Sequence, residues 1–186
     1  MSIDSLVSSL TRLADSGTSK AGGTSQSRGA LARLRRATLS PNGTVAAYRY
    51  VAPHMPADED ASDYLLIGSL FGLNPRHVGD RTRNLGTVCA DLGRQEDSSI
   101  SSAADRRFTA MLSSRRSDLL PHLRRVVMMA DRQGLAIDYV RLFYDLRRWE
   151  SEAMVSQLAW ARSFYPMKAE APSPEPGDQD ISTQEE

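Results

Sequence analysis

Apolar residues recur every three or four positions along most of this chain, and this spacing restricts the fold more than any other feature. Such spacing collects apolar side chains on one side of an α-helix, whereas a half-buried strand would alternate apolar and polar residues. Strand-like alternation is hard to find in the sequence. We therefore expect an all-α protein, built as two small helical bundles that pack together.

Polar and turn-forming segments divide the helical pattern into two halves. Residues 16–29 are rich in Gly, Ser and Thr and contain no apolar run, which predicts a flexible loop. The polar stretch 94–100 is the best internal boundary, so we expect an N-terminal half over 1–95 and a C-terminal half over 100–165. Residues 166–186 combine prolines and acids with almost no large apolar residue, which predicts a disordered tail.

Start and stop signals predict the individual helices. Ser102 and Asp105 have the spacing of a capping box that opens one helix. Helices are expected at about 3–13, 28–38, 45–51, 60–71, 85–93, 102–112 and 118–134. Asp138 caps a last helix, whose inward residues we expect to be Tyr139, Leu142, Phe143, Leu146, Trp149, Met154, Val155, Leu158, Ala161 and Phe164.

Residues that could carry catalysis or hold a metal are few and isolated. His54, His77 and His122 stand apart from one another, and Cys89 has no second cysteine or histidine at ligand spacing. Cys89 shares an apolar stripe with its helical neighbours, which indicates a small core residue. Glycine-rich phosphate loops and the GxSxG nucleophile motif are missing from the sequence. We expect no catalytic activity, no metal and no other cofactor.

Apolar runs, the first residues and the cysteine count indicate the cellular compartment. The longest apolar runs stay well short of the roughly 18 residues that a membrane-spanning helix needs. The first ten residues, MSIDSLVSSL, lack the basic start and the cleavage site of a signal peptide. A single cysteine excludes an internal disulfide framework, so we expect a cytoplasmic protein.

The net charge of zero hides an uneven distribution along the chain. Beyond Met167 the sequence contains six acidic residues and one basic residue, Lys168, which leaves 22 basic and 17 acidic residues before it, a net charge of +5. All basic residues except Lys20 and Lys168 are arginines. Arginine is well suited to bidentate phosphate contacts, although a GC-rich genome would produce the same excess.

The arginines gather in clusters, most of them in the second half. Helices that bury their apolar sides turn these guanidinium groups outward, where neighbouring helices could form a positive groove for a phosphate backbone. The alternative is a solvated surface on which nearby acids such as Asp105, Asp118 and Glu150 neutralise the arginines. Composition supports both interpretations equally. The clusters are Arg33, Arg35 and Arg36, Arg106–Arg107, Arg115–Arg116, Arg124–Arg125 and Arg147–Arg148.

Two further groups have simpler interpretations. Asp145 lies among arginines and near Glu150 and Glu152, which favours a salt-bridged helical surface over a catalytic carboxylate pair. The aromatic residues are expected in the core or at an interface instead of serving as platforms for base stacking. These are Tyr144, Trp149, Trp160 and Tyr165.

Several short motifs occur in an order that resembles CasB, the small subunit of the type I-E CRISPR surveillance complex called Cascade. The resemblance covers roughly residues 30–166, and no single motif is diagnostic. The order and spacing of the motifs within a helical chain of this length are much more specific. The motifs are ALARLRRAT at 30–38, LFGLNPRH at 70–77, NLGTVCADLG at 84–93, AADRRFTAMLSSRRSDLLPHLRRVV at 103–127, IDYVRLFYDLRRW at 137–149 and WARSFYP at 160–166.

The resemblance implies two helical halves, no catalysis, and two copies of the subunit stacked along the complex. Its implied protein partners are the CasC backbone subunits, the large subunit CasA and the second copy of the chain. Guide RNA reads the target DNA by base pairing, and the small subunits hold the open R-loop through phosphate contacts. The strands contacted would be the displaced non-target strand and, at closer range, the target strand.

The resemblance also assigns candidate nucleic-acid-binding residues, although some of them could instead clamp the two halves together. Arg35, Arg36, Arg76, Arg116, Arg124 and Arg125 match basic positions of the family. Arg106, Arg107, Arg115, Arg147 and Arg148 are basic in this chain as well.

Two other functions remain as alternatives. A stand-alone DNA-binding regulator would need a helix pair with a recognition helix, and residues 119–132, turning at Gly134 into Asp138, form the one candidate. That helix lacks a polar base-reading side, because Arg125 is followed by VVMMA. The second alternative is a purely structural adaptor, whose arginines are satisfied by acids of its partners.

Overall fold

The computed structural model of the 186-residue chain describes residues 2–18 and 25–165, apart from the side chains of residues 17 and 18. Within these ranges the chain forms nine α-helices and two short 3-10 turns, and it contains no strand. The predicted all-α fold is confirmed. The tail predicted over 166–186 and the centre of the loop predicted over 16–29 lie outside the described residues.

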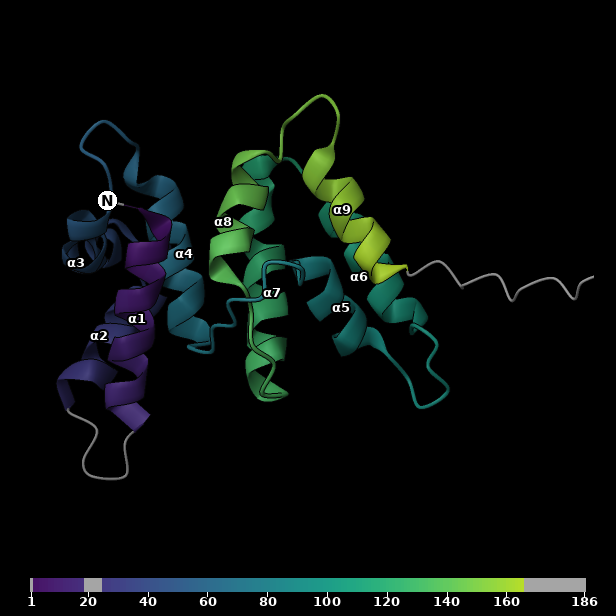
Figure 1. The fold of residues 1–186 in the computed structure, drawn as a ribbon, viewed down its shortest axis with the longest axis horizontal. Coiled ribbons are helices and arrows are strands. Elements are labelled where there is room, and N and C mark those ends of the chain that lie inside the picture. The colour runs from purple at the N-terminus through teal and green to yellow at the C-terminus, as the bar shows by residue number, and fades with distance from the viewer. Residues whose placement is uncertain (1, 19–24, 166–186) are drawn as a thin grey trace, which may run out of the picture.

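The first half consists of α1 (Ile3–Thr18), α2 (Ser25–Arg35), α3 (Pro41–Val51) and α4 (Ala61–Leu73). Figure 1 shows α4 between the other three helices and the second half. Nine consecutive residues of α4, from Tyr64 to Gly72, are buried. A helix that is apolar on all sides must be covered on all sides. The run YLLIGSLFG therefore explains why α4 is covered by first-half helices on one side and by the second half on the other.

The second half contains five helices, with α5 and α6 packed beside α9 and with α7 and α8 facing α4. Gly86 in α5 permits a very close approach, since a Cβ atom there would lie 2.2 Å from the backbone oxygen of Trp160. These helices are α5 (Leu85–Gly93), α6 (Ser102–Leu112), α7 (Leu119–Arg132), α8 (Tyr139–Arg147) and α9 (Val155–Phe164).

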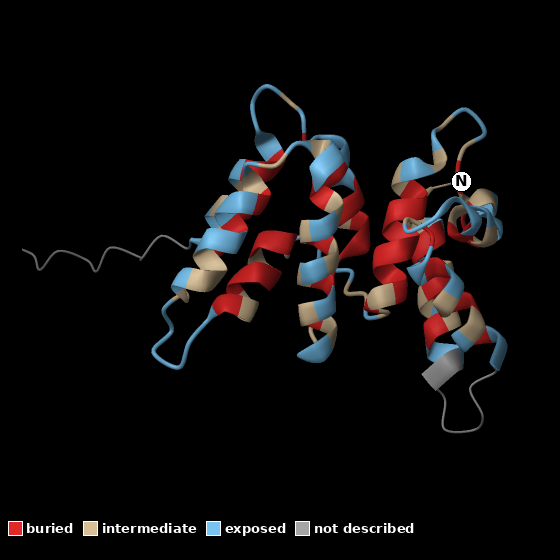
Figure 2. Ribbon diagram, turned by 180° about the vertical axis from the view of Figure 1, so that it is seen from behind, coloured by how far each residue is buried: buried red, intermediate tan, exposed pale blue. Residues whose placement is uncertain are grey.

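Aromatic contacts join the two halves. Tyr64 of α4 meets Phe143 of α8 with ring centroids 5.0 Å apart, and Phe71 meets Tyr139 at 5.2 Å. Buried residues of both halves belong to one continuous core, visible in Figure 2 as the red sides that the helices turn toward one another. Because α5 packs mainly on α9 and α6, we propose that the halves divide in the 74–84 connection, ahead of the 94–100 stretch chosen from polarity.

Side-chain caps define several helix starts. Asn84 accepts a hydrogen bond from the backbone N–H of Thr87, and Asp138 accepts one from that of Arg141, as its position predicted. The cap of α6 is Ser101, which accepts from the N–H of Ala104, so the predicted capping box at Ser102 is wrong by one residue. The sequence SISSAAD offers adjacent serines, and periodicity alone does not choose between them.

The prediction of one long helix from 138 to 165 is wrong. Helix α8 ends at Arg147, Met154 adopts a left-handed backbone with φ 48°, and α9 begins at Val155. Met154, Val155 and Leu158, expected inside, are 49%, 47% and 48% exposed. The buried side of α9 consists of Ser156, Gln157, Trp160 and Phe164.

Buried hydrogen bonds explain why α9 turns this partly polar side inward. The indole Nε1 of Trp160 donates to Asp145 Oδ2 at 2.7 Å, and the Ser156 hydroxyl donates to the Asp145 backbone oxygen at 2.7 Å. Arg141 Nε completes the group at 2.9 Å from Asp145 Oδ1. Asp145 forms the expected salt bridge on its helix, but its expected place on the surface is wrong, because its side chain is almost completely buried. A buried carboxylate needs such partners.

The loop predicted over 16–29 is shorter than expected, because α1 continues to Thr18 and α2 begins at Ser25. Packing of α2 against α4 and α1 supplies helical stability that its Gly- and Ser-rich start lacks. Among the described helices, none combines the length and the hydropathy needed to span a bilayer.

Candidate nucleic-acid interface

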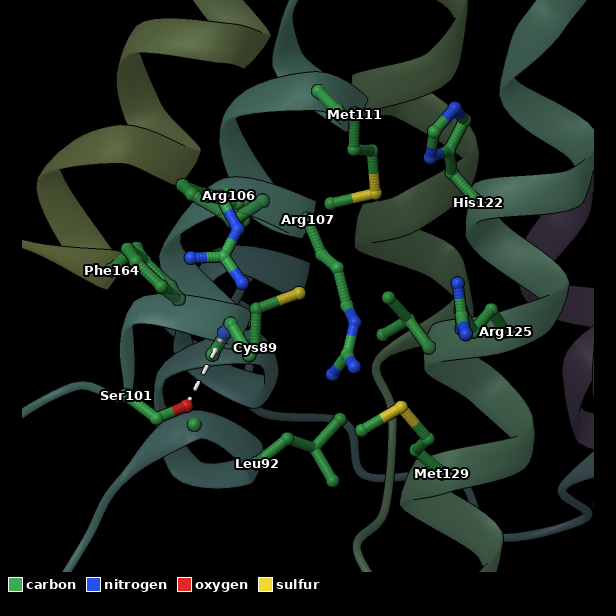
Figure 3. Close-up of a pocket in the computed structure, with 16 residues that line it drawn as sticks. Cys89, Leu92, Ser101, Arg106, Arg107, Met111, His122, Arg125, Met129 and Phe164 are labelled. Carbon is green, nitrogen blue, oxygen red and sulfur yellow. Dashed lines mark hydrogen bonds between the residues drawn. The ribbon is translucent and has the colours of Figure 1, made fainter.

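A pocket of about 350 Å³ opens between α6 and α7 (Figure 3). Its floor is apolar, and its rim carries Arg106 and Arg107 from α6 with His122 and Arg125 from α7. None of the residues that line it is acidic. The apolar lining is Cys89, Leu92, Ala103, Ala104, Phe108, Ala110, Met111, Val126, Met129 and Phe164.

Helix periodicity explains why these arginines line the pocket. Phe108 and Met111 are the buried residues of α6, so the preceding pair Arg106 and Arg107 is exposed. In α7 the buried stripe is Leu119, Leu123, Val127 and Ala130. Arg125 lies two residues from both Leu123 and Val127, on the opposite side of the helix, and is exposed.

The rim arginines have no internal counter-charge. Arg106, Arg107 and Arg125 form no ion pair or hydrogen bond with any side chain or backbone group in the described parts of the chain. The nearest acid in sequence, Asp105, accepts a hydrogen bond from the Tyr165 hydroxyl. Like charges that converge without compensation create a positive potential, and such a site attracts an anion.

A second group of arginines lies on the other flank of α7. Arg124 Nη1 donates to the backbone oxygen of Arg35 at 3.5 Å, which brings the end of α2 against α7. Arg35 Nε in turn donates to the backbone oxygen of Gly72 in α4. The exposed side chain of Arg36 follows directly and has no partner among the described residues.

These contacts connect six of the candidate residues into one series, which we call the arginine track. Arg35 touches Arg124, Arg124 and Arg125 are adjacent on α7, and Arg125 shares the pocket rim with Arg107 and Arg106. The track therefore crosses α7 from the end of α2 to α6. Its members are Arg35, Arg36, Arg124, Arg125, Arg107 and Arg106.

Arg116 and Arg147 occupy a different environment, where the two halves meet. Arg116 Nη2 lies 2.5 Å from Asp63 Oδ1, and Arg147 Nη1 lies 3.2 Å from Glu59 Oε2. Arg147 Nε is also 3.9 Å from Asp63 Oδ2, so the two arginines share one acid in the first turn of α4. These ion pairs connect η2 (Arg116–Asp118) and α8 to the first half.

Arg76 is also paired, with its Nη1 2.6 Å from Asp131 Oδ1 in α7. The remaining candidates, Arg115 and Arg148, are exposed and have no partner among the described residues. A hydrogen bond of 2.9 Å from Trp149 Nε1 to the Ser114 backbone oxygen joins the two turns that carry them. They lie outside the pocket lining and, within the described part of the chain, form no hydrogen bond or ion pair with the track.

Sequence reasoning identified every track arginine but did not single out His122, which lines the same pocket. Its Nε2 lies 3.3 Å from the Ser114 hydroxyl. Cys89 is buried at the pocket floor, and desolvation raises the pKa of its thiol to about 12, which keeps it protonated at neutral pH. This environment agrees with the predicted core role, because a reactive cysteine needs a lowered pKa. Among the described residues no three metal-ligating side chains gather.

Comparison with known proteins places the chain in context. A family model described as CRISPR-associated protein Cse2 matches residues 30–165. A protein of Thermus thermophilus named CRISPR-associated protein Cse2 is 29% identical over 141 residues, which cover 73% of this chain and 78% of that protein.

Solved structures show the same fold. The crystal structure of CasB from Thermus thermophilus is 26% identical and superimposes with a TM-score of 0.67 over 89% of this chain and 99% of that one. A chain of a structure described as a CRISPR RNA-guided surveillance complex is 22% identical, with a TM-score of 0.66 over 87% of this chain and 90% of that one.

Proposed function

The chain belongs to the Cse2 family of CRISPR-associated proteins, and from this premise we propose that it is a non-catalytic subunit of an RNA-guided DNA surveillance complex. Its part in the complex is to bind nucleic-acid backbone through the arginine track and so to stabilise the open R-loop in antiviral defence. The observation that carries this proposal is the convergence of Arg106, Arg107 and Arg125 around a pocket without a single acidic lining residue.

The proposed role is to shift the equilibrium between the closed target duplex and the open R-loop. Opening a target exchanges a DNA duplex for an RNA–DNA duplex of nearly equal stability, so modest contacts to the backbone decide how far the loop opens. Sequence is read by the guide, and the subunit therefore needs no base-specific contact. We assign the displaced strand to the track, because opening leaves this strand unpaired and a positively charged groove can follow the backbone of a single strand.

The paired arginines serve a different purpose in this proposal. Arg116 and Arg147 hold α4 against the second half through Asp63 and Glu59, and Arg76 holds the 74–84 connection to α7. By holding the two halves together, they keep the end of α2 against α7, where Arg35 and Arg124 meet. Of the eleven candidate residues, the track members are the ones we assign to nucleic-acid contact.

The proposed partners follow from the family. They are the large subunit CasA, the CasC backbone, a second copy of this chain, guide RNA and target DNA, including its displaced strand. A solved surveillance complex contains a chain of the same fold.

The stand-alone regulator is less well supported by the packing. In the α7–α8 pair, six of the nine residues of α8 are buried, so α8 has no free side to place in a major groove. The exposed part of α7 between the track and Arg132 includes Met128, which offers no base-reading group.

The test is R-loop formation by the assembled complex. Complexes would be reconstituted with wild-type chain, with the R107A/R125A variant, and with a charge-matched R12A/R81A control, whose exposed arginines contact α1 and not the track. Permanganate reactivity of thymines in the displaced strand reports opening. We expect all three complexes to assemble and only R107A/R125A to open a smaller fraction of the target. Equal opening by the three complexes would favour the structural adaptor.

A further inference from the structure

The last described residue is anchored beside the arginine track. The hydroxyl of Tyr165 donates a hydrogen bond to Asp105, which directly precedes Arg106 in α6. The Tyr165 ring also packs edge-on against Phe108, with centroids 6.1 Å apart, and its neighbour Phe164 lines the pocket. The chain therefore leaves the folded body at the pocket rim.

The sequence that continues from this point is chemically complementary to the rim. Residues 166–186 contain six carboxylates and one lysine, a side-chain charge of −5. The first acid, Glu170, is five residues beyond Tyr165, a distance of at most about 17 Å for an extended chain. The segment 166–186 also contains apolar residues, among them Met167 and Ile181, which are suited to packing on the apolar floor of the pocket.

The pocket has the complementary composition. Three exposed arginines at its rim have no partner within the described residues, and its lining contains no acid that would repel a carboxylate. A carboxylate, like a phosphate, offers two oxygens that a guanidinium can bind as a bidentate pair. The features that suit the rim to a phosphate backbone therefore suit it equally to an acidic peptide.

We propose that the acidic segment 168–186 of this chain docks in the pocket between α6 and α7 and places carboxylates on Arg106, Arg107 and Arg125. Nucleic acid displaces the segment, so binding is confined to polyanions that outcompete it. The docking is argued from the pocket, the Tyr165 contacts and the charge of the segment, and it does not depend on the proposed function. The competition with nucleic acid rests on the proposed function.

The covalent tether raises the fraction of time for which even a weak site is occupied by the segment. A segment attached at the pocket rim has an effective concentration on the order of millimolar, so a site with a dissociation constant of that order is occupied for a large fraction of the time. Removing the tail charge should then raise the affinity for single-stranded DNA by about two- to tenfold at low salt. The difference should vanish at high salt, where both contacts are screened.

Docking is tested in the full chain without nucleic acid, by paramagnetic relaxation from a nitroxide on Ser182→Cys. The label is introduced in a Cys89→Ala background, because Cys89 lines the pocket under test. We expect broadening of backbone amide signals of the α6 and α7 residues that line the pocket. The broadening should be lost in R106A/R107A/R125A and kept in the matched control R12A/R49A/R81A, whose arginines are exposed and do not line the pocket.

Three results would overturn the docking. They are the absence of broadening, broadening centred on another surface, and equally strong broadening in ¹⁵N chains that carry no nitroxide when they are mixed with nitroxide-bearing chains, which would show docking between copies. The competition is tested separately with a full-length variant in which the six tail acids are replaced by Asn or Gln. If docking is seen but this variant binds single-stranded DNA with unchanged affinity, the competition is wrong. If DNA binding by the neutral-tail variant does not depend on the track arginines, the proposed function itself fails.

Discussion

Replacing Asp145 with Asn tests the network that holds α9 on the second half. Asp145 is buried and receives two charged or polar donors, Arg141 Nε at 2.9 Å and Trp160 Nε1 at 2.7 Å. An asparagine has a single side-chain oxygen, so its amide N–H₂ must face one of these donors. The fully buried indole N–H of Trp160 is the costlier of the two to leave without an acceptor.

The expected cost follows from the groups involved. Loss of a charge-assisted hydrogen bond costs about 1.5 to 3 kcal/mol, and a buried unsatisfied donor costs about 1 to 3 kcal/mol. Because asparagine keeps part of the acceptor function, we expect a loss of about 3 kcal/mol in the free energy of unfolding. For a chain of this length that loss lowers the melting temperature by roughly 6 to 12 °C.

Urea denaturation followed by circular dichroism measures this loss, with Asp91→Asn as the control. Asp91 also pairs with an arginine, Arg83, at 2.7 Å, but both side chains are about one third exposed. The control should change stability by less than about 1 kcal/mol. An Asp145→Asn variant that is as stable as this control would show that the buried network does not hold α9 in place.

Three further predictions concern the interfaces and the buried thiol. Arg116→Ala removes the close partner of Asp63 and should lower the free energy of unfolding, measured in urea, by about 1 to 2 kcal/mol. Arg115 has no partner among the described residues, so the control Arg115→Ala should change this free energy by less than about 0.5 kcal/mol. Gly86→Ala forces a Cβ into the backbone of α9 and should lower the midpoint of thermal unfolding, with a cost of about 1 to 3 kcal/mol. Cys89, with a pKa raised to about 12 by burial, should resist thiol reagents at pH 8 until the chain unfolds. Between about pH 9 and pH 12 only the unfolded state releases this proton, so stability should fall more steeply with pH in wild type than in Cys89→Ala.

The local features of the fold were predictable because they depend on neighbours in sequence. The all-α class, the cap at Asp138 and the core positions of Cys89 and Trp149 follow from helical spacing and from the turn residues between helices. The rim arginines were predictable in the same way. Arg125 is placed opposite Leu123 and Val127 by the geometry of a single helix.

Features that depend on distant partners were not predictable. Asp63 lies 53 positions from Arg116, and nothing in the local sequence marks the two as a pair. Periodicity also misplaced the inner side of α9, because Ser156 and Gln157 satisfy buried hydrogen bonds that an apolar pattern does not register. The strand that each arginine contacts depends on partners outside the chain and stays a prediction.

The salt dependence of single-stranded DNA binding tests the central claim most directly. Fluorescence anisotropy of a labelled oligonucleotide would be recorded across a series of salt concentrations for wild type, R107A/R125A and the R12A/R81A control. If the track binds phosphates, R107A/R125A should lower the slope of log affinity against log salt by about 1.4, since each single-strand phosphate contact contributes about 0.7. A slope equal to that of wild type, or an equal loss in the control, would contradict the assignment of these arginines to the backbone of nucleic acid.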